Sequence, residues 1–376
     1  GLRLFFFFDQ LEEKETIEIK GEIVSQPYTK NEKLYFRVDR YTVISDYQNL
    51  NLGDSVAVTG KLEERKVEAS QVTLVEQTGL LGTFANIRYS LHERIIQNLP
   101  APQSQLLSGI LLGIKSDLDK DFKDNLIKTG TLHVVVVSGY DIALVAAFGL
   151  SFSFLLGRKK ASILAMSLVF GYLLLVGISA PTLRATIMAV LSLWALILGR
   201  QAIAMYLLLL TGYLMLLLNP ANLIDISFQL SFLATLSLIL FTKFISNRLN
   251  KVTKWIREPL STTLAAQILV TPLIVFYFGN VSLSALIVNP LILWTVPVAT
   301  IGGFIYLILS LFSEVLGSFV GYLLLIPLTI FTLTVEAFGQ IPWLAFQIEE
   351  HNWLVVVGYL LLVLALILHT FRKNET

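Results

Sequence analysis

Three stretches of the sequence interrupt long apolar segments with polar residues, glycine or proline. They are "VVSGYD" with Ser138, Gly139 and Asp141, "VGISAPTLRA" with Arg184, and "IVNPLILWTVP" with Asn289. In hydrocarbon every backbone polar group must find a partner, so irregular backbone survives only inside protein or along a wet cavity. Broken helices of this kind often form the binding sites of transporters. A single break is as typical of a kink or an external loop as of a site, but three together indicate a polar pathway.

Arg184 and Asp141 are the charged residues at these breaks, and we predict that they form a pair. A charge inside a membrane costs about 2.5 to 3.5 kcal/mol on insertion scales, so it usually faces the protein interior and has a partner. Further polar residues in apolar surroundings complete the predicted pathway: Gln229, Gln267, Asn289 and Asp225. Asp225 has a second interpretation, because it precedes a helical segment where a carboxylate is also a favourable N-cap.

The composition argues against most catalytic chemistry. The chain has no cysteine, and its histidines lie far apart at His92, His133, His351 and His369. A thiolate, a disulfide or a metal cluster is therefore not expected, and we interpret His133 as a hydrogen-bonded packing residue. No Ser-His-Asp arrangement, phosphate-binding loop or dinucleotide motif occurs in the sequence. We predict that this chain is not an enzyme and uses no cofactor.

Long apolar segments must position these residues. The chain has 376 residues, of which 55% are hydrophobic and only 15% are charged, whereas soluble domains carry roughly a quarter charged residues. A helix of about 20 apolar residues crosses a bilayer. We predict a polytopic α-helical membrane protein whose transmembrane region covers residues 131–376. About nine spans are expected, at 132–157, 161–178, 182–198, 201–218, 227–245, 260–278, 283–311, 315–338 and 353–371.

The basic residues predict the orientation of these spans, because Lys and Arg accumulate in cytoplasmic loops. Between Thr131 and Thr376, 11 of the 12 basic residues lie in every second loop, in "GRKK", "GR", "KFISNRLNKVTKWIR" and "FRK". This pattern places the C-terminus in the cytoplasm and the N-terminal part of the chain outside. Arg184 is the one basic residue that the pattern leaves unexplained.

The first 130 residues follow other patterns. Residues 9–78 alternate apolar and polar residues between turn-rich breaks, which predicts a small extracellular β domain, and the glycine in "VTGKL" suits a partly open barrel of the OB type. This stretch has 14 acidic and 9 basic residues, whereas single-strand binders need a positive groove, so a spacer or assembly role is favoured over DNA binding. Residues 1–8 resemble the end of a truncated hydrophobic segment. Residues 79–130 predict amphipathic helices at the membrane interface.

One predicted cytoplasmic loop combines basic residues with a tryptophan. In "KFISNRLNKVTKWIR", Lys251, Lys254 and Arg257 surround Trp255. Positive charge beside an aromatic ring suits emerging single-stranded DNA, because bases stack on such rings. The favoured interpretation is that these charges fix the topology and attract anionic lipid.

Four longer motifs lie in the stretch that runs roughly from Ser104 to Phe304. They are "GILLGIKSDLDKDFKDNLIKTGTLHVVVVSGYDIALV", "GISAPTLRATIMAV", "NPANLIDISFQLSFLATLSLILF" and "TTLAAQILVTPLIVFYFGNVSLSALIVNPLILWTVP". This stretch resembles the competence domain of the ComEC family, the inner-membrane DNA channel of natural transformation, and residues 9–78 resemble its extracellular OB-like domain. The resemblance implies that one DNA strand passes across the cell membrane into the cytoplasm. It also implies partners, namely a DNA receptor and a pilus outside and a DNA-translocating ATPase inside.

Two departures from the family pattern limit what the resemblance implies. Family members commonly have Ser-Gly-x-His where this chain has Ser138, Gly139, Tyr140 and Asp141, so a role of that histidine is not carried over. Many members end in a metallo-β-lactamase-like domain associated with degradation of the non-transferred strand, and its His-x-His-x-Asp-His motif is absent from this sequence. The nuclease is then a trimmed segment or a separate partner. Two other function classes stay open: a small-molecule or ion transporter with the same broken helices, and a membrane assembly scaffold.

Overall fold

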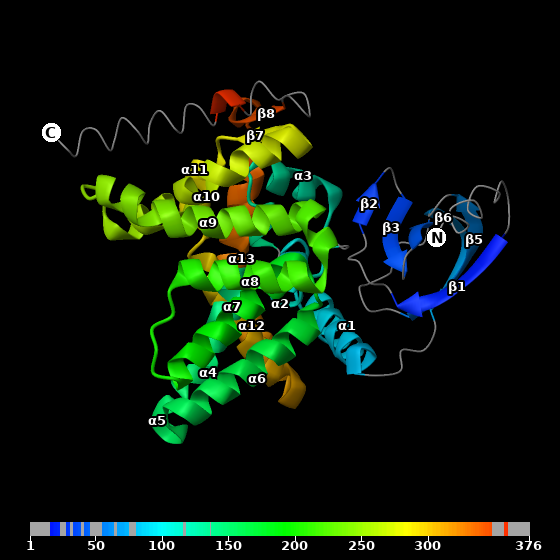
Figure 1. Ribbon diagram of the computed structural model, residues 1–376, viewed down its shortest axis with the longest axis horizontal. Coiled ribbons are helices and arrows are strands. Elements are labelled where there is room, and N and C mark those ends of the chain that lie inside the picture. The colour runs from blue at the N-terminus through cyan, green and yellow to red at the C-terminus, as the bar shows by residue number, and fades with distance from the viewer. Residues whose placement is uncertain are drawn as a thin grey trace, which may run out of the picture. The chain divides into compact units, whose positions relative to one another are not determined.

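The computed structural model contains a small β unit and a larger helical unit (Figure 1). The structure describes residues 16–22, 28–30, 33–38, 41–45, 55–63, 66–74, 80–115, 118–135, 137–347 and 357–359. The predicted fold class, a polytopic helical protein with a small N-terminal β domain, is confirmed by the long apolar helices and the separate sheet. The hydrophobic segment predicted at 1–8 lies outside the described residues.

Six strands form the sheet of the β unit. They are β1 (Thr16–Glu22), β2 (Tyr28–Lys30), β3 (Lys33–Val38), β4 (Tyr41–Ser45), β5 (Ser55–Glu63) and β6 (Lys66–Leu74). Their order is β1-β5-β6-β4-β3-β2; β4 and β6 pair in parallel, and the other neighbours pair antiparallel. One parallel pair in an otherwise antiparallel sheet is consistent with the predicted barrel of the OB type. Alternate residues fill its core, among them Phe36, Val43, Val56, Val58 and Val67.

Gly60 is the glycine of "VTGKL", and its place in β5 shows why a side chain does not fit there. The pairing of β5 with β6 shifts register between Thr59 and Gly60, which marks a β-bulge. A Cβ atom on Gly60 would lie 2.8 Å from the Cα atom of Ala69 in β6, closer than real Cβ atoms come to other atoms. Glycine therefore permits the close approach of the two strands at this bulge.

The described residues after the sheet are mainly helical. The α-helices are α1 (Leu80–Asn98), α2 (Gln103–Leu112), α3 (Lys120–Lys128), α4 (Gly139–Ser151), α5 (Ser153–Leu156), α6 (Arg158–Val176), α7 (Ala180–Ile197), α8 (Ala204–Leu218), α9 (Ile226–Arg248), α10 (Lys254–Phe278), α11 (Ala285–Ile292), α12 (Thr295–Phe312) and α13 (Glu314–Gly339). Short 3-10 helices lie at η1 (Leu132–Val134), η2 (Pro220–Ile224) and η3 (Pro342–Leu344), and β7 (Asn280–Ser282) pairs with β8 (Ala345–Gln347).

Within the described residues, seven helical segments are long and apolar enough to cross a membrane. They are Leu132–Ser151, which combines η1 and α4, and the helices α6, α7, α9, α10, α12 and α13. The segment predicted at 201–218 forms the shorter apolar helix α8, and the segment predicted at 353–371 is described only at 357–359. The seven segments qualify by their length and composition. The count of about nine spans stays a prediction.

All three predicted interruptions of apolar segments occur. The first separates η1 from α4, and the second separates α6 from α7 at Gly177, whose φ of 96° favours glycine. The third divides the segment predicted at 283–311 into α11 and α12. Pro290 lies in α11 and Pro297 in the first turn of α12, so a proline without an N–H stands on each side of the break.

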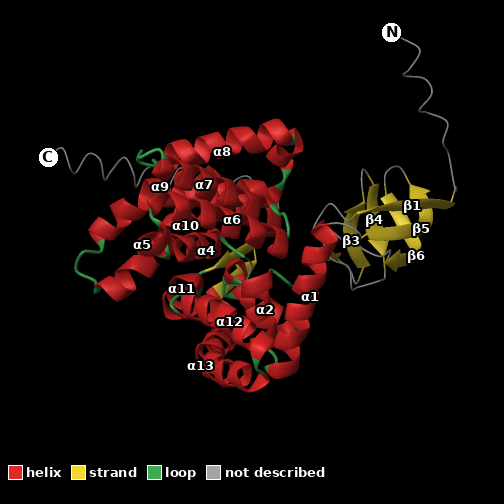
Figure 2. Ribbon diagram, turned by 90° about the horizontal axis from the view of Figure 1, so that it is seen from below, coloured by secondary structure: helices red, strands yellow, loops and turns green. Residues whose placement is uncertain are grey.

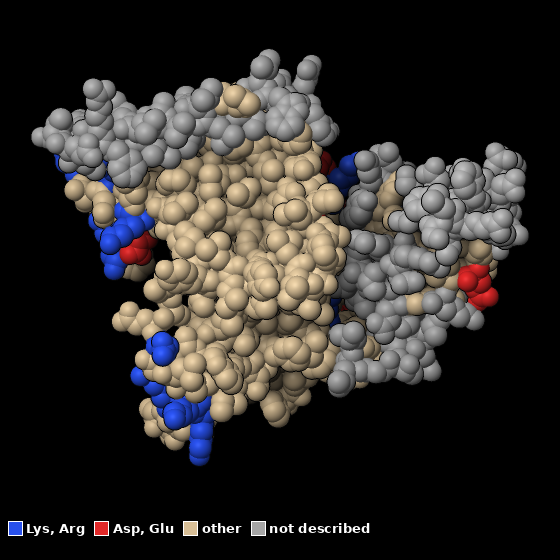
Figure 3. Space-filling view, in the orientation of Figure 1, with Lys and Arg blue, Asp and Glu red and all other residues tan. Residues whose placement is uncertain are grey.

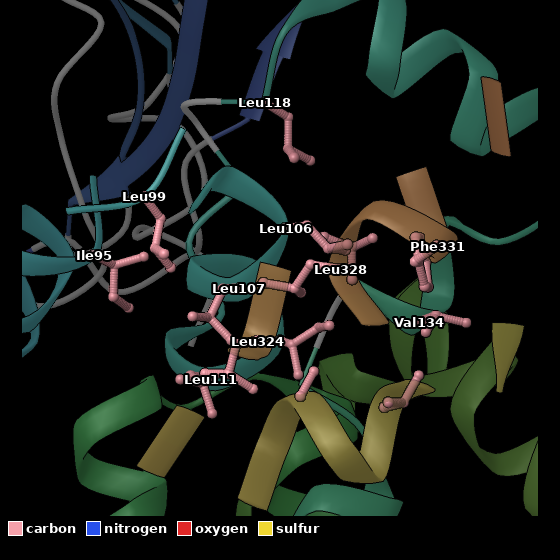
Figure 4. Packing of buried hydrophobic residues seen from close by; sticks show 14 of the residues in the cluster. Ile95, Leu99, Leu106, Leu107, Leu111, Leu118, Val134, Leu324, Leu328 and Phe331 are labelled. Atoms are coloured by element: carbon pink, nitrogen blue, oxygen red, sulfur yellow. The ribbon is translucent and has the colours of Figure 1, made fainter. Parts of the chain in front are cut away.

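Helix α2 forms the centre of the largest apolar core, although its sequence was predicted to lie at the membrane interface. Leu106, Leu107 and Leu111 are fully buried and face Leu324 and Leu328 of α13 (Figure 4). Figure 2 shows α2 beside α12 and α13. The prediction of amphipathic helices over 79–130 is untested with respect to the membrane, but α2 itself packs inside the protein.

Lys and Arg side chains gather along one edge of the helical unit. Figure 3 shows one group at the junction of α5 and α6, where Arg158, Lys159 and Lys160 lie, and another at the hairpin of α9 and α10. Most of the helical face in this view carries no charge. Basic loops on one edge of an apolar bundle are the arrangement that the positive-inside pattern predicts. Which edge faces the cytoplasm stays a prediction.

Candidate functional site

Ser138 and Asp141 form a capping box at the first turn of α4. The Ser138 Oγ atom accepts a hydrogen bond from the Tyr140 amide at 3.2 Å. In return, the Asp141 Oδ2 atom accepts hydrogen bonds from the Ser138 amide at 2.8 Å and from the Ser138 hydroxyl at 2.9 Å. This reciprocal pattern satisfies amides that the start of a helix otherwise leaves without partners. The Ser-Gly break is therefore a well-defined helix start inside an apolar segment.

The carboxylate of Asp141 is buried, with 1% of the residue exposed. A third donor comes from another helix, because the Thr300 hydroxyl of α12 donates to the Asp141 Oδ1 atom at 3.2 Å. Both carboxylate oxygens thus have hydrogen-bond donors, which stabilise a buried negative charge.

Two aromatic residues and a set of aliphatic residues line the same region. The Tyr172 hydroxyl of α6 donates to the Leu111 carbonyl at 3.1 Å, and its ring meets the Phe304 ring of α12 edge to face. The apolar cluster around the first turn of α4 consists of Val137, Ile142, Val169, Tyr172, Val176 and Ala185. Helices α4, α6, α7 and α12 therefore hold the capping box in a mainly apolar environment.

Arg184 lies in the second turn of α7 and reaches the same helix start. Only 8% of the residue is exposed, and its Nε atom is buried without a hydrogen-bond partner among the described residues. Its Nη2 atom lies 3.4 Å from the position that a Cβ atom on Gly139 would occupy, and the Ala185 Cβ atom lies 3.6 Å from that position. The guanidinium group therefore packs against the first residue of α4.

The predicted ion pair between Arg184 and Asp141 is not formed in this structure. Among the described residues, Arg184 has no ion pair and no hydrogen bond. The capping box accounts for the position of the carboxylate, because hydrogen bonds hold it at Ser138 and at Thr300 of α12. The two charged side chains lie at the same helix start but have separate surroundings.

Among the described residues, the positive charge of Arg184 has no partner at this helix start. The N-terminus of a helix carries a partial positive charge of roughly half an elementary charge. The Asp141 carboxylate at this helix start offsets that partial charge. The Arg184 guanidinium group adds a positive charge without a partner among the described residues, and a buried charge without a partner is costly. This arrangement can attract an anion that reaches the start of α4.

Asp225 and Gln229, which were placed in the predicted pathway, organise the junction of η2 and α9. The Asp225 Oδ1 atom accepts hydrogen bonds from the Ser227 amide at 2.6 Å and from the Phe228 amide at 3.2 Å. This geometry confirms the N-cap interpretation of Asp225, which is exposed. The Gln229 Nε2 atom donates to the Leu223 carbonyl at 2.8 Å. A place of these residues in the pathway stays a prediction.

Asn289 and Gln267 lie on other helices than the capping box. Asn289 of α11 is 4% exposed, and its Oδ1 atom is buried without a hydrogen-bond partner in the described part of the chain. Gln267 of α10 is half-buried, and its backbone carbonyl accepts a hydrogen bond from the Tyr359 hydroxyl at 3.4 Å. No hydrogen bond in the described part of the chain joins either side chain to Ser138, Asp141 or Arg184. Their pathway role stays a prediction.

The tryptophan of the basic hairpin is almost fully exposed, with 89% of the Trp255 surface accessible. Lys254 forms an exposed ion pair with Glu258 at 3.7 Å, and the Arg248 guanidinium lies 5.3 Å from the centre of the Phe244 ring. The Arg257 Nε atom is buried without a hydrogen-bond partner among the described residues. An exposed indole beside cations is compatible with both interpretations of this loop, which are contact with DNA and contact with anionic lipid.

Thr300 and Tyr172 were not predicted as site residues. Thr300 lies in the apolar stretch "VPVATIGGF", and Tyr172 lies in "FGYLLLV". Neither stretch carries a charge or an unusual spacing, so no signal in the sequence distinguishes these residues from others in apolar helices. His133 hydrogen-bonds through Nδ1 to the Gly130 carbonyl at 3.0 Å, and no group of potential metal ligands occurs in the described residues.

The site helices α4, α6, α7 and α12 all lie within the part of the chain that known proteins match. The model of the competence protein family covers residues 110–373. The chain belongs to the competence protein family. The chain is also similar to ComE operon protein 3 of Bacillus subtilis (strain 168), with 25% identity over 195 residues. That match covers 51% of this chain and 25% of the relative, and no solved structure matches the chain significantly.

Proposed function

We propose that this competence protein forms the route by which a single strand of DNA crosses the cell membrane into the cytoplasm. Membership in the competence protein family supports a role in DNA uptake for transformation. The observation that carries the finer proposal is the buried Arg184, which has no partner in the described chain and lies against the start of α4. A buried cation without a partner inside an apolar bundle is expensive to keep, and such residues usually serve transport.

The separate surroundings of Asp141 strengthen this proposal. Passage of a polyanion near a free carboxylate is unfavourable, but Ser138 and Thr300 donate three hydrogen bonds to Asp141. The negative charge is thereby held in place by the protein, while the positive charge of Arg184 remains available. The proposal assigns transport to this chain and no hydrolysis step.

The remaining parts of the proposal concern orientation and partners. With the basic edge in the cytoplasm, the β unit lies outside and the hairpin of α9 and α10 lies inside, where Trp255 is exposed to emerging DNA or to anionic lipid. A DNA receptor and a pilus would deliver the strand, a DNA-translocating ATPase would pull it, and a separate nuclease would remove the other strand. The resemblance of the sequence motifs supports these partners.

Channel recordings in a planar bilayer test the proposal. The purified full chain is inserted, and the ionic current is measured before and after addition of single-stranded DNA on the side of the β unit. We expect a current that single-stranded DNA blocks and double-stranded DNA of the same length does not. A current that DNA leaves unchanged would indicate an ion or small-molecule transporter, and the absence of any current would indicate an assembly scaffold.

A further inference from the structure

Gly139 needs an explanation, because neither the backbone nor the packing requires a glycine at this position. Its φ angle is not in the left-handed region. A Cβ atom would have ordinary van der Waals contacts of 3.4 Å with the Arg184 Nη2 atom and of 3.6 Å with the Ala185 Cβ atom. A side chain would instead cover the backbone at the start of α4, on the side where the guanidinium group of Arg184 lies.

Two donors at this helix start, the Gly139 amide and the Arg184 guanidinium group, lack an acceptor among the described residues. The Ser138 amide and the Tyr140 amide have partners in the capping box. No hydrogen bond from the Gly139 amide or from Arg184 occurs among the described residues. A guanidinium group has five N–H donors and no acceptor, so only an anion or another acceptor can satisfy it.

The shape of the donor group narrows the class of anion. Arg184 offers a planar fork, which matches two oxygens of a phosphate or a carboxylate. Helix N-termini commonly bind phosphate. At the start of α4 the capping box with Asp141 already pairs the Ser138 and Tyr140 amides, which leaves the Gly139 amide beside the guanidinium group. The Asp141 carboxylate does not satisfy the guanidinium group, because its hydrogen bonds are with Ser138 and Thr300.

We propose that the guanidinium group of Arg184 and the first turn of α4 bind one phosphodiester group, and that Gly139 leaves the backbone at this helix start uncovered for it. The proposal deepens the proposed function and rests on it for the assignment of this phosphodiester to DNA. A phospholipid headgroup has the same chemistry, and the experiment must separate the two sources. Arg184 lies 13 residues before the end of α7 at Ile197, about 20 Å along the helix axis from its basic end. The site is therefore remote from the basic edge.

Binding of short oligonucleotides to the full chain in phospholipid-free maltoside micelles tests the proposal. One probe is a fluorescent thymidine oligonucleotide with ordinary phosphodiesters, and the second has the same length with an uncharged methylphosphonate backbone. Phosphatidylglycerol is the third probe and acts as a competitor. The variants are Arg184→Ala, Arg184→Lys and Gly139→Ala, and the matched control is Gly171→Ala, because a Cβ atom at that position of α6 meets nothing within 4 Å. Thermal unfolding confirms that each variant is folded.

We expect Arg184→Ala to weaken binding of the phosphodiester probe about 10-fold or more, as for loss of hydrogen bonds to a charged group. Gly139→Ala and Arg184→Lys should fall between this variant and the wild type, and Gly171→Ala should equal the wild type. The methylphosphonate probe should show no dependence on Arg184.

Two other outcomes are informative. If only phosphatidylglycerol binding depends on Arg184 and Gly139, the phosphodiester site stands and its ligand is a lipid, so DNA does not pass at this position. If no probe depends on Arg184 or Gly139, the site is overturned, even where single-stranded DNA still blocks the bilayer current and the proposed function stands.

Discussion

The starts of α4 and α9 look alike in the sequence and differ in the structure. Each helix lies within residues 110–373, which the family model matches, and has an aspartate at or next to its first turn, Asp141 or Asp225. Each helix also ends toward the basic edge. Both aspartates accept hydrogen bonds from first-turn amides or their neighbours. Both were placed in the predicted pathway on the basis of charge in an apolar setting.

The difference between the two helix starts is what surrounds the cap. Asp225 is exposed, and its neighbour Gln229 closes a surface turn. Asp141 is buried, receives a hydroxyl from α12, and shares its helix start with a cation that has no partner in the described chain. The exposed Asp225 cap satisfies the first amides of α9. The buried Asp141 cap does the same for α4 and also fixes a negative charge close to Arg184 inside the apolar bundle. Burial therefore separates a structural aspartate from a functional candidate.

The largest expected effect concerns the sidedness of α9, because labelling is all or none. The chain has no cysteine, so Asn222→Cys before α9 and Thr253→Cys after it each give a single reactive site. We expect an impermeant maleimide to label the Asn222→Cys variant only from outside and the Thr253→Cys variant only from the cytoplasm, as the basic loops predict. Labelling of both variants from the same side would contradict the predicted topology and remove the basis for comparing the two helix starts.

The next effect is on DNA uptake when the charge of Arg184 is removed. Arg184→Met keeps most of the volume but loses the guanidinium group, so transformation frequency should fall by at least about 10-fold at equal protein level. Stability should stay the same or rise, because a buried cation without a partner is costly. The measurements are transformation frequency and the thermal midpoint in detergent. Arg200→Met is the control, since Arg200 is exposed after α7.

The stability of Arg184→Met also tests the missing ion pair. Removal of one member of a buried pair typically costs about 3 to 5 kcal/mol. A loss of that size would show that Arg184 has a partner within the chain. The two charges of the α4 start would then act as the pair that the sequence predicted.

A smaller effect is expected for Asp141→Ala. This change leaves the Ser138 amide, the Ser138 hydroxyl and the Thr300 hydroxyl without their acceptor, and a buried unsatisfied group costs about 1 to 3 kcal/mol. We expect the free energy of unfolding to fall by about 2 to 4 kcal/mol in total. The Asp141→Asn variant should be more stable than Asp141→Ala, because its amide oxygen can still accept hydrogen bonds. Equal stability of the wild type and Asp141→Ala would contradict the capping role.

The sequence predicted more of the fold than of the site. Period-two and long apolar patterns predicted the β domain, the helical bundle and the three breaks, because these depend on local composition. The pairing of Arg184 with Asp141 failed because it was argued by elimination among charged residues. Part of the hydrogen bonding to Asp141 comes instead from the hydroxyl of Thr300, which lies 159 positions later in the sequence. A hydroxyl in an apolar helix gives no signal until the packing of α4 against α12 brings it to the carboxylate.

The smallest expected effect is that of Asp225→Ala at the other helix start. Loss of an N-cap side chain typically costs about 1 kcal/mol, and here water can replace the carboxylate because Asp225 is exposed. Uptake should therefore equal that of the wild type once expression is matched, and Asp225→Ser should restore the stability, because a serine hydroxyl also accepts from first-turn amides. Thermal midpoints and transformation frequencies of the two variants decide this. A loss of uptake as large as that of Arg184→Met, with normal folding, would place Asp225 in the pathway and show that burial does not distinguish the two aspartates.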